Sequence, residues 1–249
     1  MEHLLRATAI AEARHFWFRG FRAFVTPLIQ TALAGRAHPL LLDCGCGTGA
    51  NVEMLSSYGR AFGFDLSATG LHIGREAGRR RLARANVTAA PFPSAAFDLV
   101  TSFDVLYALE DQPERAAIAE MFRVLKPGGY AIVNVAAMNL LRGDHSVLSQ
   151  EVRRFSRGEL RTHLQAGGFE IVRLTYTNVS IFLPLAAVRL IQRGRGLRAE
   201  RQAAESDIRV PPAPVNALMS GVMQLEAAWI RRFDAPFGSS LLCLARKPA

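Results

Sequence analysis

Residues 41–51 read LLDCGCGTGAN, an apolar run that ends in Asp43 and leads directly into three glycines at alternate positions. The run predicts a buried strand, and residues 50–57 after the glycines predict a short helix. Glycines at a strand-to-helix turn let a ligand approach the backbone closely. Ligands of open parallel sheets bind at the carboxyl ends of the strands, so this stretch predicts a ligand site at the sheet edge.

A second acidic residue indicates a ligand that contains a nucleoside. Asp65 ends an expected strand at 61–65, in the position where a carboxylate accepts hydrogen bonds from a ribose diol. The spacing Gly45-x-Gly47-x-x-Ala50 also satisfies a relaxed dinucleotide fingerprint. The two motifs alone therefore leave a nicotinamide-dependent enzyme open.

The order of the expected elements predicts an α/β fold. Apolar runs alternate with amphipathic segments of helical length, which is typical of a Rossmann-like, doubly wound, mostly parallel sheet, here expected to have seven strands. Strands are expected at 40–43, 61–65, weakly near 86–89, and at 97–103, 130–135, 169–177 and 239–245. Helices are expected at 50–57, 68–82 and 113–125, the last with Asp111 as N-cap, and after Ser156, where Glu159 completes a capping box.

Three further stretches narrow the interpretation. They are PFPSAAFDLVTSFDVLYAL at 91–109, EMFRVLKPGGYAIV at 120–133 and RRFSRGELRTHLQAGGFEIVRLTY at 153–176. Together with DCGCGTG they resemble the class I S-adenosylmethionine-dependent methyltransferases, in the small-molecule branch similar to methyltransferase type 11. The resemblance covers about residues 38–177.

The resemblance implies S-adenosylmethionine (SAM) as the cofactor. Asp43 and the glycine loop then hold its methionine end, Asp65 holds the ribose, and Leu66 lies under the adenine. The implied cofactor-binding residues within this core are Asp43, Gly45, Cys46, Gly47, Gly49, Asp65, Leu66, Val87, Thr88 and Phe103.

The chain departs from the family pattern at two places. Residues 86–89 carry no acid, although family members often place one there for the adenine amino group, so recognition is expected from the backbone near Val87 and Thr88 or from apolar contact. Ala108 stands where many relatives have a histidine after the fourth strand. A general base at that position is therefore absent.

Catalysis by positioning is the default expectation, because a sulfonium methyl group needs mainly an in-line nucleophile. A hydroxyl nucleophile gains about 10²–10⁴-fold from a positioned base. The catalytic candidates are His145, Asp104 and Tyr107, which lie in loops expected to face the crevice. His145 is equally compatible with an ordinary surface histidine.

One domain is expected, with two segments outside the repeating pattern. Residues 1–37 form a helical lid in which Trp17 and Arg19 either pack on the core or cover the cofactor, with Arg19 meeting its carboxylate. Residues 38–177 form the cofactor-binding core and residues 237–249 the final strand. Residues 178–236 are an insertion that roofs an apolar pocket, adds to the core, forms a homodimer face, or touches anionic lipid through residues 179–198.

Composition excludes several classes of partner and site. The net charge is +9, but 28 of the 30 basic residues are arginines spread along the chain without interleaved aromatics, so no nucleic acid is expected. Cys44 and Cys46 lack a second ligand pair, so no metal site is expected. The N-terminal residues lack a leader pattern, and residues 179–191 are too short to span a bilayer, so a cytoplasmic location is expected. The rivals are an NAD(P)-dependent oxidoreductase and a non-catalytic binding protein.

Overall fold

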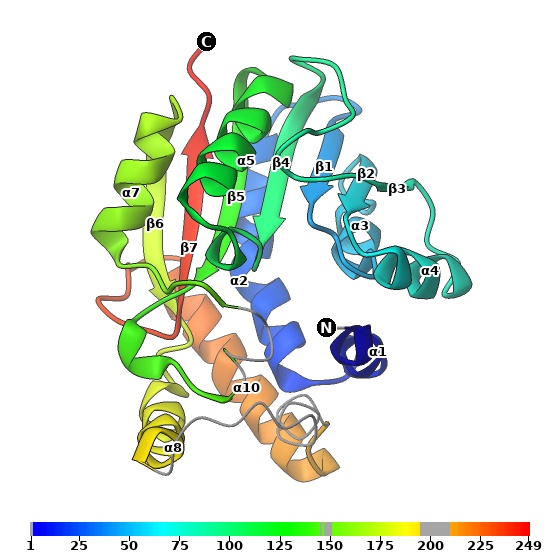
Figure 1. The fold of residues 1–249 in the computed structure, drawn as a ribbon. Coiled ribbons are helices and arrows are strands. Elements are labelled where there is room, and N and C mark those ends of the chain that lie inside the picture. The colour runs from blue at the N-terminus through cyan, green and yellow to red at the C-terminus, as the bar shows by residue number, and fades with distance from the viewer. Residues whose placement is uncertain (1, 145, 147–150, 195–209) are drawn as a thin grey trace.

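A seven-stranded sheet forms the centre of the computed structural model, which describes residues 2–144, 146, 151–194 and 210–249. Its strand order is β3-β2-β1-β4-β5-β7-β6. β7 runs antiparallel to both β5 and β6, and the remaining neighbours are parallel (Figure 1). This architecture confirms the expected fold class.

The strands and helices alternate along most of the chain. The strands are β1 Leu40–Cys44, β2 Arg60–Asp65, β3 Leu82–Arg84, β4 Phe97–Phe103, β5 Leu125–Ala136, β6 Glu170–Thr177 and β7 Ser240–Arg246. The helices are α1 Glu2–Ala11, α2 Phe16–Leu33, α3 Ala50–Leu55, α4 Ala68–Glu76, α5 Asp111–Val124, α7 Arg157–Ala166, α8 Phe182–Gly194 and α10 Ala213–Ile230, with 3-10 turns η1 Leu106–Ala108 and η2 Asn139–Leu141.

The central strands are buried on both faces, which explains their continuous apolar runs. All seven residues of β4 are buried, as are the last four of β1. β1 pairs with β2 on one side and β4 on the other, so that Leu42 lies between Phe62 and Val100. This pairing brings the carboxyl ends of β1, β2 and β4 to one edge of the sheet.

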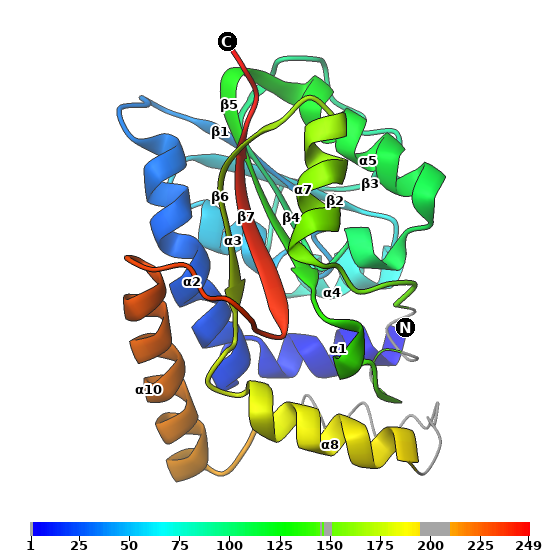
Figure 2. The ribbon, with the colours of Figure 1, turned by 90° about the vertical axis from the view of Figure 1, so that its left-hand side faces the viewer.

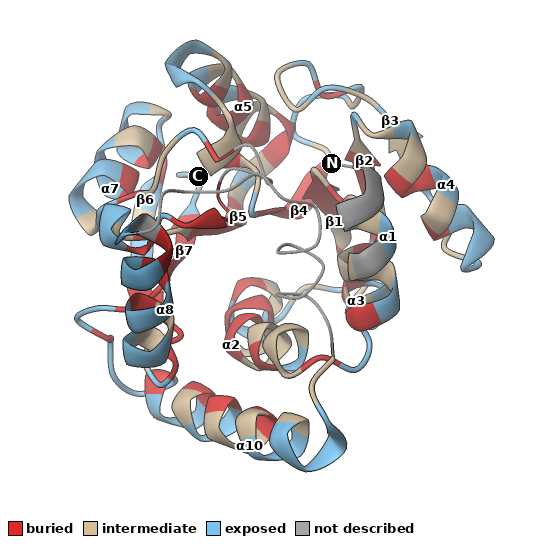
Figure 3. Cartoon of the chain, turned by 60° about the horizontal axis from the view of Figure 1, so that its bottom comes forward, coloured by how far each residue is buried: buried red, intermediate tan, exposed pale blue. Residues whose placement is uncertain are grey.

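Helices cover both faces of the sheet and continue past that edge. Figure 2 shows α5 and α7 on one face and α2, backed by α10, on the other. α2 and α10 approach closely at Gly20, where a Cβ atom would lie 2.4 Å from Met223 Cε. α1 and α8 lie beyond the carboxyl ends of the parallel strands (Figures 1 and 3).

Four local expectations need correction. The helix expected at 68–82 ends at Glu76, because Gly78 adopts a φ of +80°, and the weak strand expected near 86–89 is instead β3. β5 begins at Leu125 rather than at 130, since Leu125 already pairs with Phe97 of β4. The N-cap of α5 is Glu110, not the expected Asp111.

The capping box at Ser156 is confirmed. The Glu159 N–H donates to the Ser156 hydroxyl, and the Ser156 N–H donates to the Glu159 carboxylate. Residues 2–33 are largely helical, as expected, and the segment 178–236 contributes α8 and α10.

Candidate functional site

The glycine loop after β1 requires glycine for steric reasons. Gly45, Gly47 and Gly49 have φ values of +80°, +54° and +83°, which L side chains rarely adopt. A Cβ atom on Gly45 would also lie 2.3 Å from a methyl group of Val105. The loop therefore keeps its backbone close to the residues that follow β4.

The amide groups of this loop bond within the protein. The N–H groups of Gly45 and Cys46 donate to the Phe64 carbonyl, and the Gly49 N–H donates to the Cys46 carbonyl. The Gly47 N–H donates to Asp65 Oδ2 at 2.8 Å. A pyrophosphate cradle needs such amides free to face the ligand, so this arrangement disfavours a dinucleotide.

Asp65 joins the loop to the start of α4. Its Oδ1 accepts from the Ser67 N–H at 2.7 Å, while its Oδ2 accepts from Gly47. A carboxylate offers about four lone-pair sites, so each oxygen retains acceptor capacity for a ribose hydroxyl. The next side chain, Leu66, is 61% exposed and presents an apolar surface beside this carboxylate.

Asp43 is a buried acid with one unsatisfied oxygen. Thr101 Oγ1 donates to its Oδ1 at 2.6 Å, but Asp43 Oδ2 has no hydrogen-bond partner although it is buried. Burial raises the pKa of Asp43 to about 7, the Thr101 hydrogen bond opposes this rise, and the charge of Asp65 adds to it. An orphaned buried carboxylate oxygen fits a cationic donor, such as the amino group of a methionine moiety.

Two carboxyl groups thus flank the glycine loop, and their charges interact. Negative charge at this position repels a pyrophosphate and attracts a ligand that carries ammonium or sulfonium charge. Burial raises the pKa of the Cys44 and Cys46 thiols, so both remain protonated. Within the described parts of the chain, no three His, Cys, Asp or Glu side chains gather as a metal-binding group.

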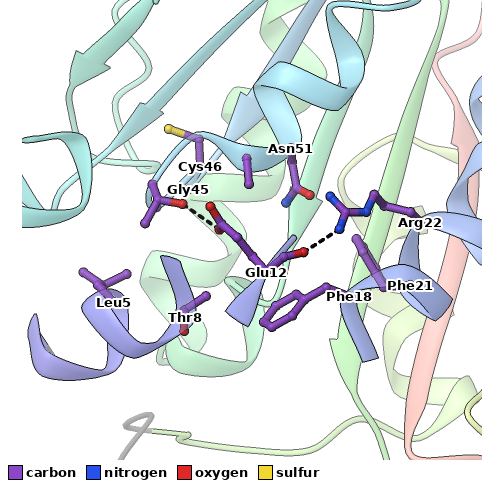
Figure 4. A pocket seen from close by; sticks show the side chains of 12 residues that line it. Leu5, Thr8, Glu12, Phe18, Phe21, Arg22, Gly45, Cys46 and Asn51 are labelled. Carbon is purple, nitrogen blue, oxygen red and sulfur yellow. Dashed lines mark hydrogen bonds between the residues drawn. The ribbon is translucent and has the colours of Figure 1, made fainter. Parts of the chain in front are cut away.

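A cavity of about 130 Å³ separates the loop from the two N-terminal helices (Figure 4). This volume is below the roughly 300–1,000 Å³ of typical ligand pockets, so the cavity as it stands can hold only part of a cofactor. Neither Asp43 nor Asp65 lines it. The cavity is lined by Leu5, Thr8, Glu12, Phe18, Phe21, Arg22, Gly45, Cys46, Gly47, Thr48, Ala50 and Asn51.

Glu12 ties α1 to the glycine loop. Its carboxylate accepts a hydrogen bond from Thr48 Oγ1 at 2.9 Å and pairs with the Arg79 guanidinium. Arg79 also donates to the Thr48 carbonyl, and Arg22 donates to the Glu12 carbonyl. These contacts could not be predicted, because a single glutamate in the turn after a helix carries no sequence signal for a partner 67 positions later.

Trp17 and Arg19 lie at the start of α2, whose N-cap His15 accepts the Trp17 N–H. Arg19 is exposed, whereas Arg22, one turn later, lines the cavity. Phe21 also lines it and packs edge-to-face on Phe103 with ring centroids 4.9 Å apart. The covering role of Trp17 and Arg19 remains a prediction.

The residues predicted to contact adenine include both apolar side chains and a polar backbone segment. Val87 is half-buried and packs against the core, and the Thr88 N–H donates to the Asn86 side chain at 3.1 Å. Phe103 is buried at the end of β4. Their contact with adenine also remains a prediction. Because the Thr88 N–H is already bonded to Asn86, Thr88 has its carbonyl oxygen available to accept from an amino group.

Asp104 follows β4 at the same edge and has a φ of +59°. Asn134 of β5 fixes it twice, because the Asn134 side chain donates to Asp104 Oδ1 at 2.9 Å and the Asp104 N–H donates to the Asn134 carbonyl. Desolvation by the surrounding protein raises the pKa of Asp104 to about 6, and the Asn134 hydrogen bond and the charge of Arg154 oppose this rise. The residue as a whole is nevertheless exposed, so its desolvation is incomplete.

Burial raises the pKa of Tyr107, so its phenol is a proton donor rather than a base at neutral pH. The negative charge of Asp104 adds to that rise, so the two predicted residues interact electrostatically. His145 lies outside the described residues. Of the three catalytic predictions, Asp104 therefore has the clearest surroundings for accepting a proton.

Comparisons with known proteins bear on the same residues. A family model described as a methyltransferase domain matches residues 42–133. A probable S-adenosylmethionine-dependent methyltransferase of Mycolicibacterium smegmatis is 30% identical over 161 residues, which cover 63% of this chain and 60% of that protein. The chain is similar to the class I S-adenosylmethionine-dependent methyltransferases, and residues 42–133 carry the match to the methyltransferase domain. SAM is the cofactor of this family, and the orphaned Asp43 oxygen fits it.

Two further proteins are similar to this chain, one in sequence and one in fold. Demethylmenaquinone methyltransferase of Lactiplantibacillus plantarum is 38% identical over 111 residues, which cover 41% of this chain and 46% of that protein. A SAM-dependent methyltransferase of Thermotoga maritima, described as a possible histamine N-methyltransferase, matches with a TM-score of 0.59 at 18% identity, covering 99% and 100% of the two chains. The latter shows the fold alone. The chain spans about half to three-fifths of the length of the two curated relatives.

Proposed function

We propose that this protein transfers the methyl group of SAM to a small, apolar molecule at an oxygen, nitrogen or carbon nucleophile. The observation that carries the proposal is the pair of carboxylates at the glycine loop, one of them with a buried, unpartnered oxygen. Both lie at the carboxyl edge of the sheet, where α/β folds bind their ligands. The bound cofactor supplies an activated methyl group on a sulfonium.

Each residue near the loop has a distinct task in this proposal. Asp43 Oδ2 accepts from the cofactor's ammonium group, and the free lone pairs of Asp65 accept from the ribose hydroxyls. Leu66, Val87 and Phe103 offer apolar contact to the adenine, which would compensate for the missing acid at 86–89. These contacts place the methyl group, and placement is the main source of the rate.

Asp104 is the residue that we propose as proton acceptor for a hydroxyl or amine nucleophile. A raised pKa of about 6 makes its carboxylate a better base than an ordinary aspartate, while most of it stays ionised at pH 7. Asn134 donates to Oδ1, so Oδ2 is the oxygen that we propose as the proton acceptor. Tyr107 would donate a hydrogen bond to the acceptor. For His145 we retain the alternative role of base as a prediction from the sequence.

The apolar character of the acceptor is supported by the helices around the site. α8 and α10 carry large exposed apolar side chains, and the related proteins include an enzyme named for demethylmenaquinone. We propose a small molecule rather than a nucleic acid as partner, and the cytoplasm as the compartment. No helix of the described parts is long and apolar enough to cross a membrane.

A labelled-methyl assay tests the proposal. The protein is incubated with methyl-labelled SAM and a panel of quinols, phenols, amines and fatty carboxylates, and the label is then measured in the organic phase. Transfer by the wild type and loss of transfer in Asp104→Asn and Asp65→Ala would support it. Cofactor binding without transfer to any member of the panel would contradict it and favour the non-catalytic binding protein.

A further inference from the structure

Helix α8 has the reverse of the usual amphipathic arrangement. Its described polar side chains, Arg189 and Gln192, are buried, while Leu183, Leu190 and Ile191 are 74%, 53% and 69% exposed. A surface helix in water normally turns its apolar stripe inward. The described outer face of α8 therefore exposes apolar surface and no charge.

The buried polar side of α8 is anchored to the loop that follows β5. Arg189 donates to Gln192 Oε1 at 2.7 Å, and the Asp144 N–H donates to the same oxygen at 3.3 Å. The loop approaches so closely that a Cβ atom on Gly143 would lie 2.3 Å from Arg189 Cδ. These contacts fix the rotation of the helix, so the outward direction of its apolar side chains is built into the packing.

The apolar surface extends beyond α8. η2 packs against this helix and adds Leu140, which is also exposed, and Val188 contributes from α8 itself. We call this surface the α8 face; it comprises Leu140, Leu183, Val188, Leu190 and Ile191. Figure 3 views the molecule from the side on which α8 and α1 extend past the carboxyl ends of the strands.

The exposed charged residues that the structure describes on α1, α2 and the residues after η2 are all arginines. Arg6 and Arg14 of α1 and its following turn, Arg19 of α2 and Arg142 after η2 are all exposed. The two acids of these elements whose burial the structure describes, Glu12 and Asp144, are buried; Glu12 pairs with Arg79, and Asp144 lies beneath α8. Asp104 is an exposed acid at the edge, but it lies in the site after β4. The described surface of these elements is thus apolar and cationic.

We propose that the α8 face docks this protein on the surface of an anionic lipid bilayer. Exposed leucine and isoleucine side chains, with arginines on elements at the same end of the molecule (Figure 1), are the combination that binds the boundary between headgroups and acyl chains. A second copy fits less well, because an isologous contact through this face would bring Arg142 and its neighbours toward their own equivalents. If the proposed function holds, docking also lets an apolar acceptor enter from the lipid beside the site.

Vesicle sedimentation with the whole chain, in the absence of cofactor and acceptor, tests this docking. The probes are vesicles of phosphatidylcholine alone and of phosphatidylcholine with about one quarter phosphatidylglycerol. We expect sedimentation with the anionic vesicles, weaker sedimentation with neutral ones, and loss of the difference at high salt. Leu183→Asp and Ile191→Asp, at the two ends of the helix, are each expected to lower the partition coefficient about tenfold or more.

Val172→Asp is the matched control, because Val172 is 51% exposed on β6, and the substitution adds the same charge. It should leave vesicle binding near that of the wild type, with equal far-ultraviolet circular dichroism in all variants. Failure of the wild type to sediment with either vesicle, or an equal loss in Val172→Asp, would overturn the proposal. So would a dimer in sedimentation velocity that Ile191→Asp dissociates. Failure of the proposed function is detected separately, by calorimetry with S-adenosylhomocysteine.

Discussion

The glycine-loop edge and the helical cap lie against each other, but the first is determined by local sequence and the second by contacts between distant residues. The glycine-loop edge comprises residues 43–51 and 65–66, and its chemistry follows from residues that are neighbours in sequence or one strand apart. The helical cap comprises α1, α2, α8 and α10, and it is held by contacts such as that of Phe16 with Asn216, 200 positions apart. Local backbone constraints can be read from a motif, whereas pairings between distant side chains cannot.

The two regions should also differ in their tolerance of substitutions. The glycine-loop edge uses positive φ values and carboxylates with more than one task, so a single substitution should disturb several contacts there. The cap is joined to the loop by the small polar cluster of Glu12, Thr48 and Arg79. Substitutions in the cap should therefore have smaller and more local effects.

The largest effect is expected from Asp65→Ala. The substitution removes the acceptor for the Gly47 and Ser67 amides and for the ribose, and each hydrogen bond to a charged group contributes about 1.5–3 kcal/mol. Calorimetry should show at least about a hundredfold weaker binding of S-adenosylhomocysteine. Glu76→Ala, an exposed acid at the end of α4, is the control and should bind normally. Equal affinity in both variants would remove Asp65 from the site.

Gly45→Ala should follow in size. The new Cβ atom meets Val105 and the residue must keep a φ of +80°, which together should cost about 2–4 kcal/mol of unfolding free energy. Denaturant unfolding measures this loss. Adding Val105→Ala should recover the steric part but not the backbone part. A double variant that is no more stable than Gly45→Ala would show that the close approach to Val105 is not the constraint.

The pH dependence of cofactor affinity tests Asp43. Its raised pKa means that the acid is protonated below about pH 7, whereas a cationic ammonium favours the ionised form. Affinity for S-adenosylhomocysteine should therefore rise by up to about tenfold per pH unit between pH 5.5 and 7 and then level off. Asp43→Asn, which keeps an acceptor for Thr101, should flatten this profile. A flat wild-type profile would contradict the assignment.

The same raised pKa has a consequence for the stability of the free protein. Since the folded pKa of Asp43 lies above the unfolded value, its contribution is fully present below about pH 4 and is lost as the pH rises through 7. Asp43→Asn should consequently gain unfolding free energy relative to the wild type from pH 6 to pH 8. Urea unfolding at several pH values measures this difference, and a constant difference across that range would exclude Asp43 as its source.

The smallest effect is expected in the cap. Glu12→Gln replaces the charged partner of Arg79 and should loosen α1, lowering its local opening free energy by about 1–2 kcal/mol. Hydrogen exchange should show faster exchange in α1, by about one order of magnitude, with β4 unchanged. Glu53→Gln removes the exposed partner of the same arginine and should change little. If β4 exchanged faster as well, the cap and the core would be one cooperative unit.

The sequence predicted the sheet because buried parallel strands and capped helices have local patterns. Six of the seven strands, the capping box at Ser156 and the resemblance to methyltransferases followed from such patterns, but the strand at Leu82–Arg84 did not. That strand is three residues long and lacks an apolar run, so its pairing with β2 decides its structure. The start of β5 at Leu125 is likewise set by β4, although Pro-Gly-Gly usually indicates a turn.

In the site, too, some features follow from local motifs and others depend on contacts between distant elements. The glycine loop, Asp43 and Asp65 follow from motif spacing, and the structure adds the orphaned Asp43 oxygen, which no sequence pattern contains. The Glu12 cluster and the pair formed by Asp104 and Asn134 depend on contacts between elements. For residues 179–198 the sequence left core, pocket roof, dimer face and lipid contact open, because an apolar periodicity states which residues share a face but not whether that face is inside.

The central claim is that the glycine-loop edge is an anionic site for SAM rather than a pyrophosphate cradle. Titration calorimetry of the purified chain with S-adenosylhomocysteine and, separately, with NADH tests it most directly. The expected result is micromolar binding of S-adenosylhomocysteine and no detectable binding of NADH. Binding of NADH at comparable strength, or binding of neither ligand, would contradict it.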